Sequence, residues 1–248
     1  MNVILKAEGL RKNFGGLKAV DNVDLTITEG ELRGVIGPNG AGKSTLFNLL
    51  TGYYSCDSGR IFLKGREITS LSAPEIVCFG MARTFQRTNI FGNLTVKENV
   101  LIPLLRNNGS SWNPLTPINR LFKKEIEDLL ETMGISDKAD HVASTLSQGH
   151  QRCLEIAVAL ANMPDILLLD EPASGMSVSE SANMLELVKS INRQRGTTIL
   201  FTEHDMNVVF SLAQKITVLH FGKVIAEGTP DEIRNTKEVQ QVYLGEVA

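Results

Sequence analysis

The run GPNGAGKST, from Gly37 to Thr45, restricts the possible folds more than any other part of the sequence. It fits the pattern G-x-x-x-x-G-K-[ST], follows the apolar stretch Leu32 to Ile36, and precedes leucines at helical spacing. Glycines at these positions let backbone N–H groups turn towards an anion, because side chains would block the approach or forbid the backbone angles. The run therefore predicts a phosphate-binding loop between a strand and a helix.

The pattern also assigns contacts within the loop. Lys43 is expected to reach the β and γ phosphates of a nucleotide as a point charge, and the Ser44 hydroxyl to take one position on Mg²⁺. Thr45 is expected to assist at the α phosphate, while the positive end of the helix points at the same anion. The alternative is a glycine-rich turn formed by chance, which the flanking strand and helix argue against. The predicted nucleotide-binding residues of the loop are Gly37, Pro38, Asn39, Gly40, Ala41, Gly42, Lys43, Ser44 and Thr45.

Two adjacent carboxylates, Asp170 and Glu171, end the apolar run Ile166 to Leu169. Open α/β sheets bind their ligands at the carboxyl ends of the strands, so this is where acids can act on a nucleotide. Neighbouring strand residues point to opposite faces, so we expect one acid to face the metal and the other to be turned towards water by the end of the strand. Asp170 is predicted to hold Mg²⁺ through its water shell, and Glu171 to be the general base for the water that attacks the γ phosphate. An acid pair that stood alone could equally be a solvated turn.

His204 lies within the tetrapeptide TEHD, at the end of the apolar stretch Thr198 to Thr202. A histidine at this place can donate a hydrogen bond to the γ phosphate, or position the attacking water and Glu171, which makes it a candidate catalytic residue. A lone histidine is more often an ordinary surface residue. The assignment therefore depends on the phosphate loop and the acid pair.

Apolar runs and helical stretches alternate in the second half of the chain, which predicts a parallel sheet with crossover helices. Short β-rich runs near the start suggest antiparallel elements packed beside this core. These runs are Val23 to Ile27, Leu32 to Ile36 and Ile61 to Leu63. We expect an α/β fold with a P-loop NTPase (RecA-like) core, an antiparallel β subdomain and an inserted helical subdomain. Residues 1–248 would form one nucleotide-binding domain, with 1–86 and 164–248 as the ATP-binding core and 87–163 as the helical subdomain.

Composition argues against other functional classes. The chain has 248 residues, a formal net charge of -3 and no Lys/Arg cluster, so there is no electrostatic reason to expect nucleic acid as a partner. Its apolar runs are far shorter than the roughly 20 residues that a membrane-spanning helix needs. The first residues lack the basic start, apolar core and cleavage site of a secretion signal. These observations predict a cytoplasmic protein.

The remaining motifs resemble the ATP-binding-cassette (ABC) family over essentially the whole chain. The stretch Leu146 to His150, LSQGH, looks like the family's signature LSGGQ, and Gln86 in RTFQ matches its Q-loop. Phe14 in KNFGG matches the aromatic residue that stacks on adenine, and stacking needs only a flat π face. His204 matches the switch histidine. The resemblance implies that Gln86 contacts Mg²⁺ and water, and that it joins the helical subdomain to the core.

The resemblance also implies a head-to-tail dimer with two ATP molecules between the cassettes. The phosphate loop of one subunit would face the signature of the other, so Ser147 and Gly149 would serve the partner's γ phosphate through a hydroxyl and a backbone N–H. The alternative is that Ser147 is only a helix cap. Gln148 and His150 depart from the signature, and Ser177 stands where the family commonly has Asp or Asn. We therefore expect slower hydrolysis at the ATP site that this signature completes.

Two longer stretches, RTFQRTNIFGNLTVKENVL and IAEGTPDEIRNTKEVQQVYLGE, look like the subunits that drive uptake of branched-chain amino acids. The expected protein is an ATPase that uses ATP and Mg²⁺ to energise uptake of branched-chain or related amino acids. Its expected partners are membrane permease subunits, a second ABC ATPase subunit and a substrate-binding protein, on the inner face of the cell membrane. The alternatives are an importer of urea or short amides, a soluble ABC ATPase that needs no permease, and a P-loop kinase.

Overall fold

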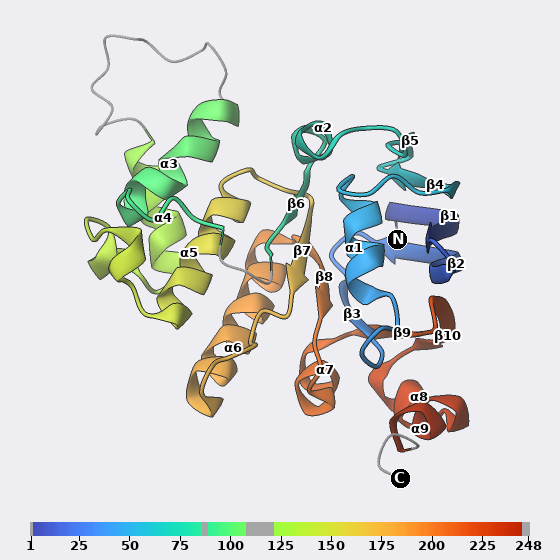
Figure 1. The fold of residues 1–248 in the computed structure, drawn as a ribbon. Helices are drawn as coiled ribbons and strands as arrows, with labels where there is room; N and C mark the ends of the chain where they lie inside the picture. The colour runs from blue at the N-terminus through green and yellow to red at the C-terminus, as the bar shows by residue number, and fades with distance from the viewer. Residues whose placement is uncertain (1, 86–88, 108–121, 245–248) are drawn as a thin grey trace.

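The computed structural model describes residues 2–85, 89–107 and 122–244 (Figure 1). The described chain forms two sheets with helices around them, and a helical group lies to one side of the larger sheet. Gln86, the predicted Q-loop residue, lies outside the described ranges.

The larger sheet has six strands and carries the site. Its strands are β3 (Leu32–Ile36), β6 (Met81–Arg83), β7 (Ile166–Asp170), β8 (Thr198–Thr202), β9 (Lys215–His220) and β10 (Lys223–Gly228). Their order is β10-β9-β3-β8-β7-β6, and every neighbouring pair except β9 with β10 is parallel. Strands β3, β7 and β8 are buried at every residue, as is usual for parallel strands covered on both faces. The predicted parallel core is confirmed.

The smaller sheet has four antiparallel strands and lies on the right of Figure 1. They are β1 (Val3–Phe14), β2 (Leu17–Thr28), β4 (Ser58–Leu63) and β5 (Arg66–Glu67), in the order β2-β1-β4-β5. The antiparallel β portion is confirmed, but the prediction that Leu32–Ile36 belongs to it is wrong. That segment is β3, parallel to both β8 and β9. The strand that precedes it in the chain is not its partner in space, and its continuous burial suits the middle of a covered sheet.

Helices alternate with the strands of the core sheet along the chain, and two more follow its last strand. They are α1 (Lys43–Leu50), α2 (Ala73–Cys78), α6 (Val178–Arg195), α7 (Met206–Leu212), α8 (Pro230–Arg234) and α9 (Lys237–Leu244). Helix α6 begins where Ser177 and Glu180 form a capping box, and it ends at Gly196 with φ 65°. Within the described ranges, no helix has the combination of length and apolar character needed to span a membrane.

The helical group contains α3 (Val96–Asn107), α4 (Lys123–Thr132), η3 (Ser136–Lys138), η4 (Ala143–Thr145) and α5 (Gln148–Leu160), and it lies on the left of Figure 1. Helix α5 begins at Gln148, inside the signature stretch Leu146 to His150, because Ser147 is its N-cap and accepts the N–H of His150 at 3.4 Å. Buried Leu130 and Leu154 share one hydrophobic cluster with Leu169 of β7, so apolar packing joins this group to the core sheet. The limits 87–163 for a helical subdomain remain a prediction.

Candidate active site

Three neighbouring strands bring the phosphate loop, the acid pair and His204 to one edge of the sheet. Strand β8 lies between β3 and β7, and its Thr202 is in register with Val35 on one side and Asp170 on the other. The phosphate loop follows β3, His204 follows β8, and the acid pair ends β7. The carboxyl ends of parallel strands thus gather segments that are far apart in the chain.

The loop between β3 and α1 is closely backed by other parts of the chain. A Cβ at Gly37 would lie 2.2 Å from the carbonyl oxygen of Leu219, and a Cβ at Gly42 would lie 2.3 Å from that of Ala19. Gly42 has φ 106° and forms the N-cap of α1 without a side-chain hydrogen bond. The first N–H groups of a helix have no acceptor within the helix, so this end of α1 can donate to an anion. The loop therefore fits a phosphate.

Side chains of the loop differ in exposure. Lys43 is buried, and its Nζ donates to the carbonyl oxygens of Gly37 at 2.5 Å and Pro38 at 3.1 Å. Ser44, the next residue, is exposed at the start of α1, and Thr45 is half-buried. A buried ammonium and an exposed hydroxyl thus stand on adjacent residues at the start of α1.

The two acids point to different partners. Asp170 is buried, its Oδ1 accepts the Thr202 hydroxyl at 2.8 Å, and its Oδ2 lies 2.9 Å from a terminal nitrogen of Arg83. Glu171 leaves the strand with φ 50°, and its Oε1 lies 2.5 Å from Nε2 of His204. A left-handed conformation costs a residue with a side chain about 1–2 kcal/mol, and such strain is common where function requires it. The end of the strand does turn the second acid away from the first.

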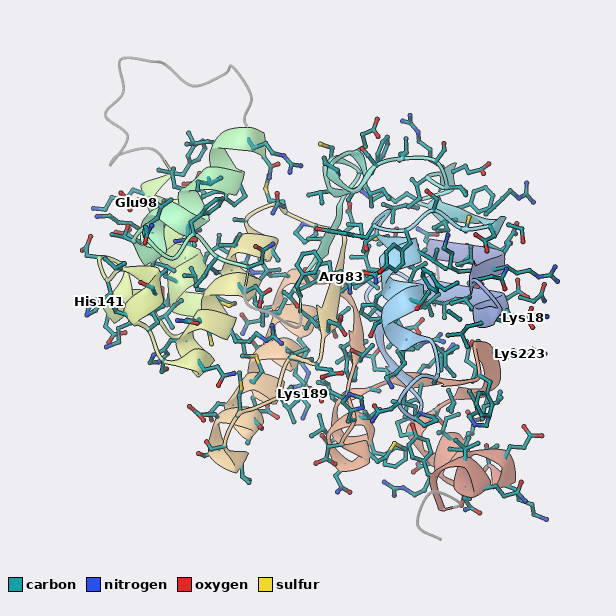
Figure 2. All side chains as sticks on the ribbon, in the orientation of Figure 1. Lys18, Arg83, Glu98, His141, Lys189 and Lys223 are labelled. Carbon is teal, nitrogen blue, oxygen red and sulfur yellow. The ribbon has the colours of Figure 1, made fainter. Side chains whose placement is uncertain are left out.

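Arg83, at the end of β6, is a site residue that the sequence analysis missed. It lies in the middle of the molecule, between the helical group and the β-rich side (Figure 2). Besides Asp170, its guanidinium donates to Oδ1 of Asn48 in α1 at 2.6 Å. The rings of Phe47 and Phe85 flank it with centroids 5.6 and 5.1 Å away. Arg83 thereby links the helix that follows the phosphate loop to the acid that ends β7. The only feature of the sequence that could have indicated this role is a lone cation in an apolar strand.

Glu203 is a second missed residue, and it lies beside the catalytic candidates. Its carboxylate accepts the backbone N–H of Ala173 at 2.9 Å, which holds the turn after the acid pair. Burial raises the pKa of Glu203 above its usual value, since the charged form loses its hydration. The nearby carboxylate of Glu171 raises the pKa of Glu203 further through like-charge repulsion, so this pKa depends on a neighbouring site residue as well as on burial.

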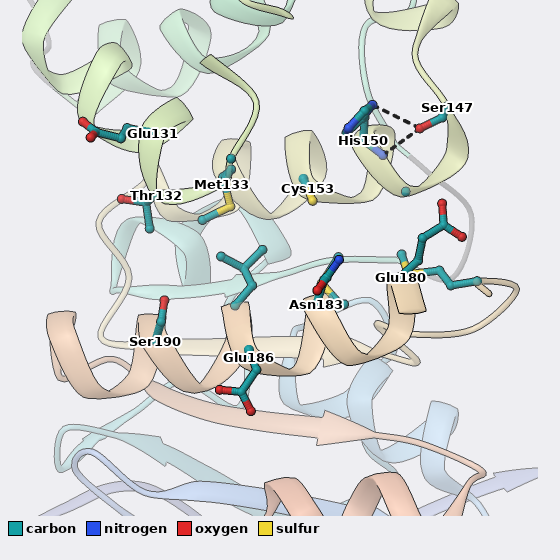
Figure 3. A pocket seen from close by; sticks show the side chains of 15 residues that line it. Glu131, Thr132, Met133, Ser147, His150, Cys153, Glu180, Asn183, Glu186 and Ser190 are labelled. Carbon is teal, nitrogen blue, oxygen red and sulfur yellow. Dashed lines mark hydrogen bonds between the residues drawn. The ribbon is translucent and has the colours of Figure 1, made fainter. Parts of the chain in front are cut away.

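The signature residues lie at the start of α5, where Figure 3 shows Ser147 beside His150. The Ser147 hydroxyl contacts Nδ1 of His150 at 3.1 Å, and the Gln148 amide lies against Gly175, 3.3 Å from where a Cβ would stand. Glu180 of α6 approaches Gly149 in the same way at 3.4 Å, beside a cavity of about 500 Å³ between α5 and α6. Gln148 and His150, the two residues that depart from the family signature, therefore each contact another residue of this chain.

Phe14 ends β1 and is 45% exposed. The ring of Tyr54 meets it edge to face at a centroid distance of 5.5 Å, and Nζ of Lys12 lies 5.7 Å from its centroid. The close approach of Ala19 in β2 to Gly42 places the β1–β2 hairpin beside the phosphate loop. An exposed aromatic ring thus lies on the hairpin that borders the loop.

The donor set suits a hard cation that is shared with phosphates. Among the residues described, no three or more His, Cys, Asp or Glu side chains are grouped so as to hold a metal by themselves. Mg²⁺ in nucleotide sites is usually held by one or two protein oxygens, with waters and phosphates completing the octahedron. The carboxylate of Asp170 and the hydroxyl of Ser44 are donors of this kind.

Comparison with known proteins agrees with this geometry. Residues 20–174 match the family model described as ABC transporter, and residues 223–248 match the one described as branched-chain amino acid ATP-binding cassette transporter. The chain is 42% identical to the high-affinity branched-chain amino acid transport ATP-binding protein LivG of Salmonella typhimurium, over 98% of each chain.

Solved structures show the same fold. The ADP conformation of MJ1267, an ATP-binding cassette of an ABC transporter, superposes with a TM-score of 0.85 at 30% identity, over 99% of this chain and 100% of that one. The dimeric cassette MJ0796 bound to ADP and Pi superposes with a TM-score of 0.79 at 28% identity, over 92% of this chain and 99% of that one. The chain therefore belongs to the ABC transporter family, as a cassette that binds and hydrolyses ATP.

Proposed function

We propose that this chain is the ATPase subunit of an importer for branched-chain amino acids. The observation that carries the proposal is the match of residues 223–248 to the branched-chain model, because this segment lies outside the stretch 20–174 that matches ABC transporters in general. It includes β10, α8 and α9, which contact one another at the far end of the sheet from the helical group. Full-length identity to LivG supports the same substrate class.

Residues 37–45 would bind the phosphates of ATP, with Lys43 at the β and γ phosphates and Thr45 at the α phosphate. Support comes from the tight backing of Gly37 and Gly42, since a Cβ at either position would clash with the backbone behind the loop, so only glycine allows this loop conformation. The exposed ring of Phe14, on the hairpin beside the loop, would stack on adenine.

Ser44, Asp170 and Gln86 would hold Mg²⁺, which neutralises charge that develops on the transferred phosphoryl group. Glu171 would accept a proton from the attacking water, and His204 would orient that carboxylate. The distance of 2.5 Å between His204 Nε2 and Glu171 Oε1 supports this division of roles. A general base must be held within hydrogen-bond reach of its proton, and the imidazole restricts where Glu171 can point.

Ser147 and Gly149 would serve the γ phosphate held by a second cassette. Ser147 is exposed at the start of α5, so its hydroxyl and the nearby helix N–H groups can reach another chain. Ser147 begins α5 in the helical group, whereas the chain's own phosphate loop precedes α1 on the other side of β6 and β7 (Figure 1), which favours a role in a partner's site.

The remaining proposals concern the division of the chain into subdomains and the assembly in which it works. Residues 1–86 and 164–248 would be the ATP-binding core, and 87–163 the helical subdomain. Membrane permease subunits, a second cassette and a substrate-binding protein would complete the importer, with this chain on the inner face of the cell membrane.

The test is purification of the tagged chain from gently solubilised membranes, identification of the proteins that accompany it, and reconstitution of that assembly in vesicles. Uptake of radiolabelled leucine that requires ATP, and that Glu171→Gln abolishes, would support the proposal. Uptake of labelled urea or acetamide instead of leucine would reject the substrate class. Recovery with soluble proteins alone would reject the importer and favour the soluble ATPase.

A further inference from the structure

Arg152, in the second turn of α5, joins three segments of the site. Its side chain is buried, with 8% exposed, and one terminal nitrogen donates to Glu155 Oε2 at 2.7 Å and to the carbonyl oxygen of Phe85. The other donates to the carbonyl oxygens of Asp170 at 3.2 Å and Glu171 at 3.0 Å. One guanidinium thus holds both members of the acid pair through their backbone.

Glu155, one helical turn later, completes the arrangement. Its Oε1 accepts the backbone N–H of Phe85 at 2.9 Å, while its Oε2 pairs with Arg152. Both backbone polar groups of Phe85 are therefore held by this pair, directly before Gln86 in the chain. The carboxylate also neutralises the buried guanidinium, which would otherwise be costly to bury.

The backbone of Glu171 is the part most in need of support, because its φ of 50° is unfavourable for a residue with a side chain. Its N–H is held by Thr202, whose carbonyl and hydroxyl oxygens both lie 3.2 Å away. Its C=O is held by Arg152. Because φ and ψ determine where the Cβ points, these two anchors determine where the carboxylate meets His204.

We propose that Arg152 is a positioning residue for ATP hydrolysis, which holds Glu171 in its left-handed conformation and links the acid pair to the helix that begins at the signature. This inference rests on the proposed function of Glu171 as general base. Movement of α5 relative to β7 changes the support of the Glu171 backbone, so the state of the signature helix affects the chain's own hydrolytic site. Only arginine can do this, because its planar fork carries several donors, whereas the single lysine ammonium cannot occupy both terminal positions.

The test is Arg152→Lys in the full-length chain, with the turnover number for ATP and the affinity for a fluorescent ATP analogue both measured. We expect turnover to fall by about tenfold or more, as for other lost positioning contacts, while affinity changes by less than about threefold. Affinity should persist because the phosphate loop is on other elements. The matched control is Arg33→Lys, which also replaces a buried arginine paired with a glutamate, but at the far end of β3. It should leave turnover unchanged.

A double-variant measurement separates positioning from general loss of structure. In the Glu171→Asp background, Arg152→Lys should cost much less turnover than in the wild type, because both changes act through one carboxylate. Equal losses in both backgrounds, or a loss in Arg152→Lys no larger than in Arg33→Lys, would overturn the inference.

A failure of the role proposed for Arg152 can be distinguished from a failure of the role proposed for Glu171. If Glu171→Gln retains full turnover, the proposed function of Glu171 fails; if it abolishes turnover while Arg152→Lys does not lower it, only the role of Arg152 fails. Should Arg152→Lys not fold, Glu155→Gln decides, since it keeps the side-chain volume but removes the charge that pairs with Arg152. Unchanged turnover in a folded Glu155→Gln variant would overturn the inference, and a several-fold loss at constant affinity would support it.

Discussion

Breaking the buried pair between Arg83 and Asp170 by removing one partner should lower stability measurably before any nucleotide binds. The two side chains are 6% and 7% exposed, so water screens their attraction little. Removing one partner of a buried pair costs about 3–5 kcal/mol, because the other charge stays buried. In Asp170→Asn, the guanidinium keeps its bond to Asn48 and the faces of Phe47 and Phe85, which places the expected loss near the lower limit, about 3 kcal/mol.

The assay is urea and thermal denaturation of the chain without nucleotide, followed by far-ultraviolet circular dichroism, for Asp170→Asn, Arg83→Met and the double variant. A loss of about 3 kcal/mol corresponds to a fall in Tm of about 6–12 °C for a chain of this size. The double variant should lose less than the sum of the single losses, since it leaves no unpaired charge behind. Losses that add to within about 0.5 kcal/mol would show that the pair is not coupled and would refute the reasoning.

Three other changes test the site from different directions. Gly42→Ala should abolish retention on immobilised ATP, because its Cβ would lie 2.3 Å from a carbonyl oxygen of β2, whereas Gly40→Ala, with nothing within 4 Å, should retain more binding. Glu203→Gln should stabilise the fold at pH 8 but not at pH 4.5 in thermal denaturation. The folded pKa of Glu203 is raised above 4.5, so its favourable contribution is complete below that pH and is lost as the pH rises through the folded pKa. Burial raises the pKa of Cys153 to about 11, so at pH 8 only about one thiol in a thousand is ionised, and mass spectrometry should show iodoacetamide modifying the exposed Cys78 much faster.

Local features of the site were predictable because they depend on neighbouring residues alone. The glycines of the phosphate loop are required by its backbone angles and by the close approach of other backbone atoms. The acids at 170 and 171 are recognised because they stand at the end of an apolar run. The start of α6 was likewise within reach, since Ser177 and Glu180 have the spacing of a capping box. Each of these signals spans fewer than about ten residues, the range over which backbone conformation restricts its neighbours.

Contacts across long stretches of chain were not predictable in this way. Arg83 and Asp170 are 87 residues apart, and Arg152 holds the carbonyl of Glu171 from 19 residues away, so no short stretch of sequence contains both partners. Their partners are set by which strand lies beside which. The prediction that Leu32–Ile36 belongs to the antiparallel sheet failed for the same reason. The residues of this segment indicate a strand, but they do not indicate which strand it pairs with.

The sequence by itself determined the phosphate loop, the acid pair and several of the strands and helices, since glycine geometry and apolar periodicity act locally. Only the tertiary structure decided that β8, the last of the three strands in the chain, lies between β3 and β7. That order brings His204 to Glu171 and Thr202 to Asp170. The physical reason is that the order of parallel strands depends on how whole faces of the sheet are buried by the helices that connect them. No single segment of the sequence determines this burial.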